Sequence, residues 1–183
     1  MVAAVNDLPL VEPALLSDPL DFFFAEHYRQ RKLCNLMEQL ATAAALDAPV
    51  ATGILDFLRH DMVLHVQDEE EDLFPLMRLR CAPADEIERV LSALTAEHAG
   101  DRHLSGLVVE GLEAALADGR PPSACPRLRE AMVDFVRNQR RHLALENSVV
   151  LPLARLRLTA DDLVALSARM TRRHGGETAK AKA

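Results

Sequence analysis

Two segments of the chain pair a histidine with a glutamate four residues later. The pairs are His65 with Glu69 and His142 with Glu146. On a helix, residues four apart lie on one face, about 40° apart around the axis and about 6 Å apart along it. An imidazole and a carboxylate so placed can bind one metal ion. A single pair of this kind is more typical of a surface helix contact, so the meaning of these two pairs depends on their surroundings.

Both pairs lie within longer segments that repeat. Residues 65–80 read HVQDEEEDLFPLMRLR, and residues 142–157 read HLALENSVVLPLARLR. A second pattern precedes each copy, since residues 25–33 read AEHYRQRKL and residues 96–104 read AEHAGDRHL. The order is the same in both halves, and the repeat is too long for a solenoid unit. The sequence therefore predicts a duplicated helical hairpin, with equivalent positions facing each other across a pseudo-twofold axis.

Capping residues, prolines and apolar spacing predict the helices that carry these segments. Ser17 or Asp18 caps the first helix, and Thr159 with Asp162 resembles a capping box for a short fifth one. The four long helices are expected over about 20–46, 49–74, 83–117 and 126–151, with Pro75 ending or kinking the second. Short connections between long helices are typical of an up-down bundle.

We therefore expect an all-α protein, an antiparallel up-down four-helix bundle with a short extra C-terminal helix. The predicted parts are an N-terminal extension (1–17), the bundle (18–158), the C-terminal helix (159–173) and a disordered tail (174–183). The third helix contains Gly100, Gly106 and Gly111. Because each glycine costs about 1 kcal/mol relative to alanine in a helix, close packing or a ligand is the expected reason for them.

Composition excludes several classes of protein. The 183 residues are 49% hydrophobic and 27% charged, which is typical of one globular domain, and the net charge of −7 disfavours a nucleic-acid partner. No apolar run approaches the length of a membrane span, and no basic segment of a secretory signal opens the chain. Cys34, Cys81 and Cys125 form no close pairs. We expect a cytoplasmic protein without a disulfide framework.

In such a bundle the repeated residues point to the centre. They comprise four histidines and two glutamates: His27, His65, His98, His142, Glu69 and Glu146. Burying them without a partner would be costly, because buried charge must be paired or coordinate a metal. Imidazole with carboxylate suits iron, manganese or zinc. Six side chains are too many for one tetrahedral ion but suit two ions, each bound by two histidines and bridged by the glutamates.

The conjunction of these motifs, over roughly residues 18–157, resembles the hemerythrin-like HHE cation-binding family. One histidine on the first and third helices and H-x3-E on the second and fourth match its pattern at all six positions, and DPLDFFFAEH resembles the opening of bacterial members. The resemblance implies a centre of two iron ions that binds O2, NO or peroxide. Manganese and zinc stay open as alternatives.

One position departs from the O2-carrying members of that family. Those proteins have a further histidine four residues after the third-helix histidine, where this chain has Arg102, and the repeat equivalent is Arg31. The resulting set of four histidines and two glutamates is similar to the di-iron domain of proteins that repair iron–sulfur clusters after nitric oxide stress. Those proteins carry an N-terminal cysteine-bearing segment, which this sequence does not show.

Five residues near the ligand histidines could contact the ligands, or a molecule bound to the metal, without being proposed as primary ligands: Arg31, Arg102, Glu26, Glu97 and Tyr28. The arginines either balance carboxylates and steer an anionic ligand, or extend into solvent. The two glutamates either hydrogen-bond a ligand, act as spare ligands or are solvated. Tyr28 either hydrogen-bonds bound oxygen or packs at a helix contact. The acidic run from Asp68 to Asp72 is expected to be a solvated face apart from Glu69.

Three hypotheses of function follow. The first is a di-iron protein that binds O2, NO or peroxide for sensing, storage or detoxification. The second is an enzyme or iron donor in stress defence, acting by peroxide turnover or iron–sulfur cluster repair. The third is a structural bundle without metal. The sequence does not distinguish an enzyme from a binding protein, and it leaves the oligomeric state open.

Overall fold

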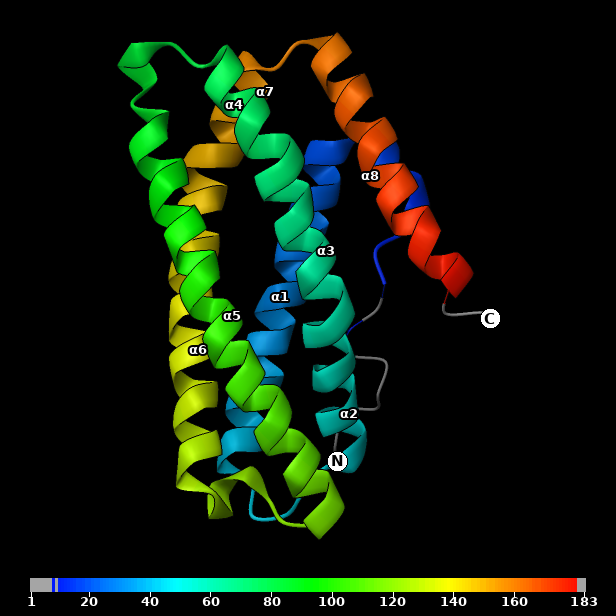
Figure 1. The fold of residues 1–183 in the computed structure, drawn as a ribbon, viewed down its shortest axis with the longest axis vertical. Coiled ribbons are helices and arrows are strands. Elements are labelled where there is room, and N and C mark those ends of the chain that lie inside the picture. Colours follow the sequence, from blue (N-terminus) through cyan, green and yellow to red (C-terminus); the bar gives the residue numbers. More distant parts are fainter. Residues whose placement is uncertain (1–7, 9, 181–183) are drawn as a thin grey trace.

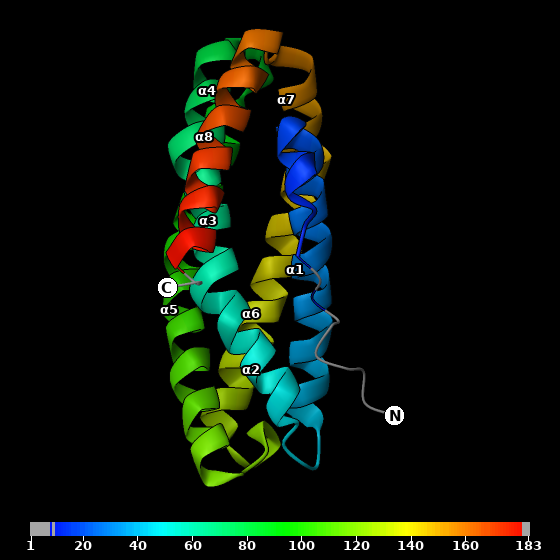
Figure 2. The ribbon, with the colours of Figure 1, turned by 90° about the vertical axis from the view of Figure 1, so that its right-hand side faces the viewer.

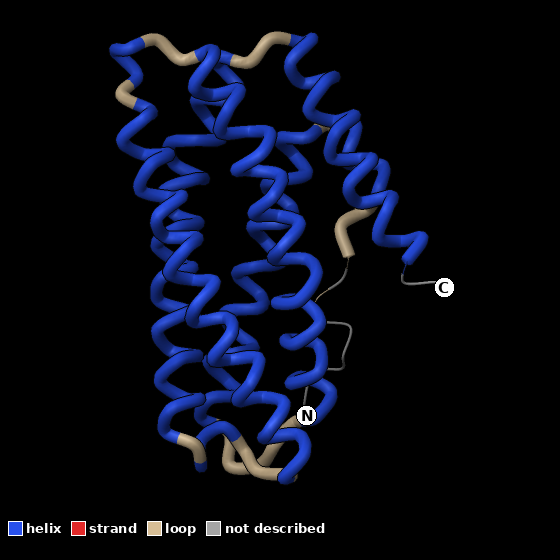
Figure 3. Tube along the Cα trace, in the orientation of Figure 1, coloured by secondary structure: helices blue, strands red, loops and turns tan. Residues whose placement is uncertain are grey.

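A computed structural model describes residues 8 and 10–180 of the chain, and within them all regular structure is helical, with no strand (Figure 3). The first hairpin joins α1 (Pro19–Thr42) to a long second helix built from α2 (Ala48–Asp56), α3 (Met62–Gln67) and α4 (Phe74–Arg80). The second hairpin joins α5 (Ile87–Asp118) to a helix built from α6 (Pro126–Leu145) and α7 (Leu151–Arg157). A last helix, α8, covers Ala160–Lys180.

The four long helices form an antiparallel up-down bundle, with α8 beside it (Figures 1 and 2). Helix α6 packs against both α1 and α5, and α2 likewise contacts α1 and α5. The first and third helices are therefore diagonal to each other, as are the second and fourth. The fold class predicted from the sequence is confirmed.

Capping side chains begin the helices where the sequence predicts. The Asp18 carboxylate accepts a hydrogen bond from the Asp21 N–H at 3.1 Å, and Pro19 occupies the first turn. Thr159 and Asp162 form the predicted capping box. The Asp162 N–H donates to Oγ1 of Thr159 at 3.2 Å, and the Thr159 N–H donates to Oδ2 of Asp162 at 2.9 Å. These residues fix where α1 and α8 enter the bundle.

The predicted ends of the second and fourth helices are wrong, because both helices continue through their prolines. A proline lacks an N–H, and its ring clashes with the carbonyl four residues earlier. Here the turns before Pro75 and Pro152 widen into π-helical segments, Asp68–Leu73 and Glu146–Val150, which absorb that clash. The second helix thus reaches Arg80 and the fourth reaches Arg157. A further π-helical segment, Phe57–Asp61, joins α2 to α3.

Two apolar clusters fill the bundle, one toward each end. One contains Leu33 and Phe135, and the other contains Phe23 and Phe74, all of them 2% exposed or less. On α1, His27 lies between Phe23 and Leu33 in sequence, and the other three repeated histidines likewise separate members of the two clusters. The polar residues therefore form a layer across the middle of the bundle.

The C-terminal helix is longer than the sequence predicts. It continues past residue 173 to Lys180, so the first seven residues of the predicted tail are helical, and residues 181–183 lie outside the described part. Leu166 and Met170 are fully buried in the cluster that contains Phe23. Of the predicted N-terminal extension, residues 1–7 and 9 lie outside the described part, and Pro13–Ser17 forms a 3-10 turn.

One of the three glycines in α5 serves close packing. A Cβ on Gly111 would lie 2.7 Å from Cδ1 of Leu128, so α5 and α6 approach closely there. A Cβ on Gly100 or Gly106 would meet nothing within 4 Å, so the packing explanation is wrong for those two. Gly119 ends α5 with φ at 65°, a conformation that favours glycine.

Candidate metal centre

The bundle brings the six predicted ligands together in two overlapping groups. His27 and His65 form one group with both glutamates, and His98 and His142 form the other with the same two glutamates. In each group the ligand atoms lie within 4.8 Å of one another, and all members are buried. Glu69 and Glu146 belong to both groups. The arrangement therefore offers two adjacent positions for cations, with two carboxylates able to bridge them.

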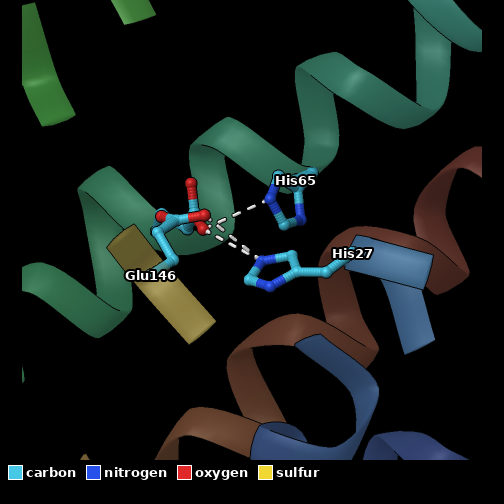
Figure 4. Close-up of side chains that lie close together, drawn as sticks. His27, His65 and Glu146 are labelled. Atoms are coloured by element: carbon cyan, nitrogen blue, oxygen red, sulfur yellow. Dashed lines mark ion pairs between the residues drawn. The ribbon is translucent and has the colours of Figure 1, made fainter. Parts of the chain in front are cut away.

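The first position lies between α1 and the second helix (Figure 4). Nε2 of His65 is 3.2 Å from Oε1 of Glu69, and Nε2 of His27 is 3.3 Å from Oε2 of Glu146. Nε2 of His27 also lies 3.8 Å from Oε1 of Glu69. The imidazoles of His27 and His65 and the carboxylate of Glu146 point toward one another (Figure 4).

The second position lies between α5 and α6 and repeats this geometry. Nε2 of His142 is 3.2 Å from Oε1 of Glu146, and Nε2 of His98 is 3.2 Å from Oε2 of Glu69. The two Nε2 atoms of His98 and His142 are 3.1 Å apart. The duplication in the sequence is thus a duplication of the site.

The π-helical turns start at or beside the glutamates of this site. The backbone C=O of Glu69 accepts from the N–H of Phe74, and that of Glu146 accepts from the N–H of Leu151, five residues on in each case. π-helical turns occur frequently at functional sites. The proline of each repeat follows directly, so the P-L-x-R-L-R part of the motif sets the backbone that presents each carboxylate.

Several polar atoms facing the centre have no hydrogen-bond partner among the described residues. They are Nε2 of His27, Nε2 of His65, Oε2 of Glu69 and both carboxylate oxygens of Glu146. An unsatisfied buried polar atom costs about 1–3 kcal/mol, so such a group of them needs a common partner. Nitrogen and oxygen donors that surround one point without hydrogen-bonding each other fit a cation. Imidazole and carboxylate suit iron, manganese and zinc.

In the metal-free site, burial and the charges of neighbouring side chains shift the pKa values of the ligands in opposite directions. Burial lowers the pKa of His65, but the Glu69 carboxylate outweighs it and raises the pKa to about 9. Burial likewise lowers the pKa of His142, and Glu146 overcomes it to raise the pKa to about 10. Burial raises the pKa of Glu69, yet the neighbouring imidazoles hold that pKa well below its usual range. Without metal, the site is a layer of coupled charges.

The outer nitrogens of two histidines have partners that the sequence analysis missed. Nδ1 of His98 is 2.8 Å from Oε1 of Glu70, and Nδ1 of His27 is 3.1 Å from Oδ1 of Asn147. Glu70 and Asn147 directly follow Glu69 and Glu146, so they occupy equivalent positions of the repeat. Aligning the two repeats places Glu70 opposite Asn147, each directly after a ligand glutamate, and this alignment was the sequence signal that could have pointed to them.

The supporting residues proposed from the sequence behave differently from one another. Glu97 accepts from Nδ1 of His142 at 3.1 Å, as one of its interpretations required. Glu26 is buried, so it is not solvated; it pairs with Arg29 at 2.8 Å and makes no hydrogen bond to a ligand histidine. Arg31 and Arg102 are exposed, which fits their alternative interpretation as side chains that extend into solvent. Tyr28 is 55% exposed, so its expected packing at a helix contact is wrong.

The interpretation of residues 68–72 as a solvated face is wrong. Asp68 and Asp72 are 1% and 3% exposed and face α8. Arg173 bonds Asp68 and lies 2.8 Å from Asp72, while His174 Nε2 lies 2.7 Å from Asp68. Helix α8 thus neutralises the acidic turn that carries Glu69. No repeat or spacing in the sequence links Arg173 to that turn.

A cavity of about 330 Å³ reaches three of the four histidines. It is lined by His65, His98 and His142, with apolar side chains such as Phe135 and Met62 and polar ones such as Gln139, Asp101 and Arg102. Arg102 therefore lies at the cavity although it is exposed. A cavity beside the ligand layer gives a small molecule a place next to both cation positions.

The family is established by the match of the chain to a family model. The model of the hemerythrin HHE cation-binding domain matches residues 18–154, so the chain belongs to this family. A search of curated proteins returns no match. Family and geometry agree on a metal-binding bundle. None of the helices in the part of the chain described above is long and apolar enough to cross a membrane.

Proposed function

We propose that this protein is a non-haem di-iron protein that binds or reacts with O2, NO or peroxide in sensing, storage or detoxification. The observation that carries the proposal is the layer of six buried ligands. Five inward atoms of His27, His65, Glu69 and Glu146 have no hydrogen-bond partner among the described residues, and the two glutamates belong to both groups of ligands. A pair of iron ions supplies redox chemistry and open coordination positions for small ligands.

The chain's own residues have defined tasks in this proposal. The four histidines and two glutamates hold the two ions, and the bundle core excludes bulk water on both sides of the layer. The cavity lets a small molecule approach beside His98 and His142. Gln139 is a buried polar residue of the cavity lining, and its side chain donates to Oε1 of Gln30 at 2.5 Å. It is placed to hydrogen-bond a polar ligand.

The size of the cavity favours a second candidate function, an enzyme that turns over peroxide. A volume of about 330 Å³ is that of a small-molecule pocket and exceeds the needs of a diatomic gas. Its lining includes the hydrogen-bonding side chains of Gln139, Asp101 and Ser105. An iron donor for cluster repair uses the same site. We also propose a cytoplasmic location, which the three free cysteines support.

The test is metal analysis of protein purified without air, followed by absorption spectra on adding O2, NO and hydrogen peroxide in separate experiments. Iron with a spectral response to one of these ligands supports the proposal, and repeated consumption of peroxide selects the enzyme. Bound manganese or zinc without such a response overturns the di-iron function. A folded protein that binds no metal favours the structural bundle.

A further inference from the structure

The two cation positions share Glu69 and Glu146, so these carboxylates do not make one position different from the other. Each position also has two histidines that present Nε2 inward. What differs is the group that holds each histidine from behind. A histidine bound to a metal through Nε2 donates its other ring N–H to a nearby acceptor, and an anionic acceptor makes the imidazole a better donor to the metal.

Carboxylates hold both histidines of the second position. Nδ1 of His98 lies 2.8 Å from Glu70, and Nδ1 of His142 lies 3.1 Å from Glu97. The charge of Glu97 is shared with Arg141, whose Nη2 is 2.9 Å from its other oxygen. Glu70 makes its contact to His98 alone among the hydrogen bonds of the described residues. Both imidazoles of this position are therefore backed by negative charge.

At the first position, no carboxylate among the described residues hydrogen-bonds the outer nitrogen of a histidine. His27 faces the neutral amide of Asn147 at 3.1 Å, and that amide is fixed because its Nδ2 donates to the Leu143 C=O at 2.7 Å. Nδ1 of His65 is buried and has no hydrogen-bond partner among the described residues. The equivalent of Glu97 is Glu26, but its carboxylate accepts from Arg29, which also contacts Asp61 at 3.2 Å.

We infer that the two cation positions are unequal, with Glu70 and Glu97 making the His98–His142 position the tighter one and the one filled first. The inference rests on the proposed dinuclear site and deepens it. Removing an outer partner of a metal-bound histidine costs about 10–100-fold in metal affinity. The His27–His65 position, backed by one amide, is expected to bind its ion more weakly by a similar factor.

The test is to titrate metal-free protein with Zn²⁺ in competition with a chromophoric chelator, and then to repeat the titration in a calorimeter. Zinc avoids redox changes during the titration. We expect two binding phases separated by about tenfold or more in affinity. Glu70→Gln and Glu97→Gln should each weaken the tighter phase by about tenfold and leave the weaker one almost unchanged. Both side chains are partly exposed, at 30% and 20%, so these variants should fold.

Two further variants complete the test. Glu71→Gln removes the same charge one residue from Glu70 but touches no histidine, so both phases should keep their affinities. Asn147→Asp places a carboxylate behind His27 and should strengthen the weaker phase. Two phases of equal affinity, or Glu70→Gln and Glu97→Gln variants that bind like the parent, would overturn the inference while leaving a dinuclear site. Absence of zinc binding in folded parent protein would instead contradict the proposed function.

Discussion

Arg157 forms a two-point ion pair with Asp85, and the pair has an exact counterpart in the other half of the chain. Its Nε is 2.9 Å from Oδ2 and its Nη2 is 2.7 Å from Oδ1 of Asp85. Arg80, the repeat equivalent of Arg157, makes the same two bonds to Asp162 at 2.7 and 2.9 Å. Arg157 ends α7 and binds the turn that follows Arg80. In the same way, Arg80 ends α4 and binds the turn that follows Arg157.

The same exchange occurs at the metal layer. His98 in the second half contacts Glu70 in the first, and His27 in the first half contacts Asn147 in the second. The halves are thus linked by reciprocal contacts at the end of the bundle and at its centre. Neither hairpin completes the site alone, since each cation position takes one glutamate from each half.

The shared glutamates predict that one substitution damages both positions. Glu69→Ala removes a carboxylate that lies 3.2 Å from both His65 and His98. We expect this variant, and Glu146→Ala likewise, to lose most bound metal from the whole centre, measured as metal per chain after gel filtration. Glu71→Ala is the control and should keep full loading. If Glu69→Ala keeps one firmly bound ion while Glu146→Ala keeps none, the two glutamates do not bridge.

The sequence was sufficient for the fold and for which residues gather, because the duplication repeats both helix patterns and ligand spacing. It was insufficient for the helix ends, since a proline within a helix normally marks a boundary and the compensating π turn depends on tertiary context. The burial of Asp68 and Asp72 was missed because it needs arginines about 100 residues later in the chain. The repeat places Glu70 and Asn147 at equivalent positions, but Glu70 was missed because the packed bundle is needed to show that it faces His98.

Metal binding should release protons. The pKa of His65 is raised to about 9 and that of His142 to about 10 in the metal-free site. Both imidazoles are therefore protonated at pH 7 and must lose a proton to bind a metal. Affinity should rise with pH from 7 toward 9. The raised pKa values also stabilise the metal-free fold. This stabilisation is fully present below about pH 6.5, and it is lost as the pH rises through the pKa values of the two histidines in the folded protein.

Calorimetry measures this release directly. Zinc is titrated into metal-free protein at one pH in buffers of different ionisation enthalpy, and the slope of the observed heat gives the protons released. We expect more than one proton per chain at pH 7. A heat that does not change with the buffer would show that the histidines are already neutral.

Helix α8 should stabilise the metal-bearing turn. Among the partners found in the described residues, Arg173→Ala leaves Asp72 with Arg169 and leaves Asp68 with His174. Weakening the partners of buried acceptors costs about 1–3 kcal/mol of unfolding free energy. Urea denaturation of the metal-free protein measures the change. Arg172→Ala, the exposed neighbour, should have an effect close to zero. Equal stability of the two variants would mean that α8 does not hold the acidic turn.

Two glycines of α5 should respond in opposite directions to alanine. Gly111→Ala places a Cβ 2.7 Å from Leu128, and overpacking of this kind costs about 1–3 kcal/mol. Gly106→Ala meets open space and should stabilise the helix by about 1 kcal/mol. Thermal melts of the two variants and the parent decide the matter. Both changes gain the same helix propensity, so the close packing of α5 on α6 is contradicted if Gly111→Ala melts at or above the temperature of Gly106→Ala.

The most direct test of the dinuclear centre is the metal content of the intact protein. Protein made in iron-replete cells and purified without air is analysed for iron, manganese and zinc against a protein concentration from amino-acid analysis. The account predicts about two metal ions per chain, with iron as the main element. A value near zero or one per chain in protein whose helical content and melt show it to be folded would contradict it.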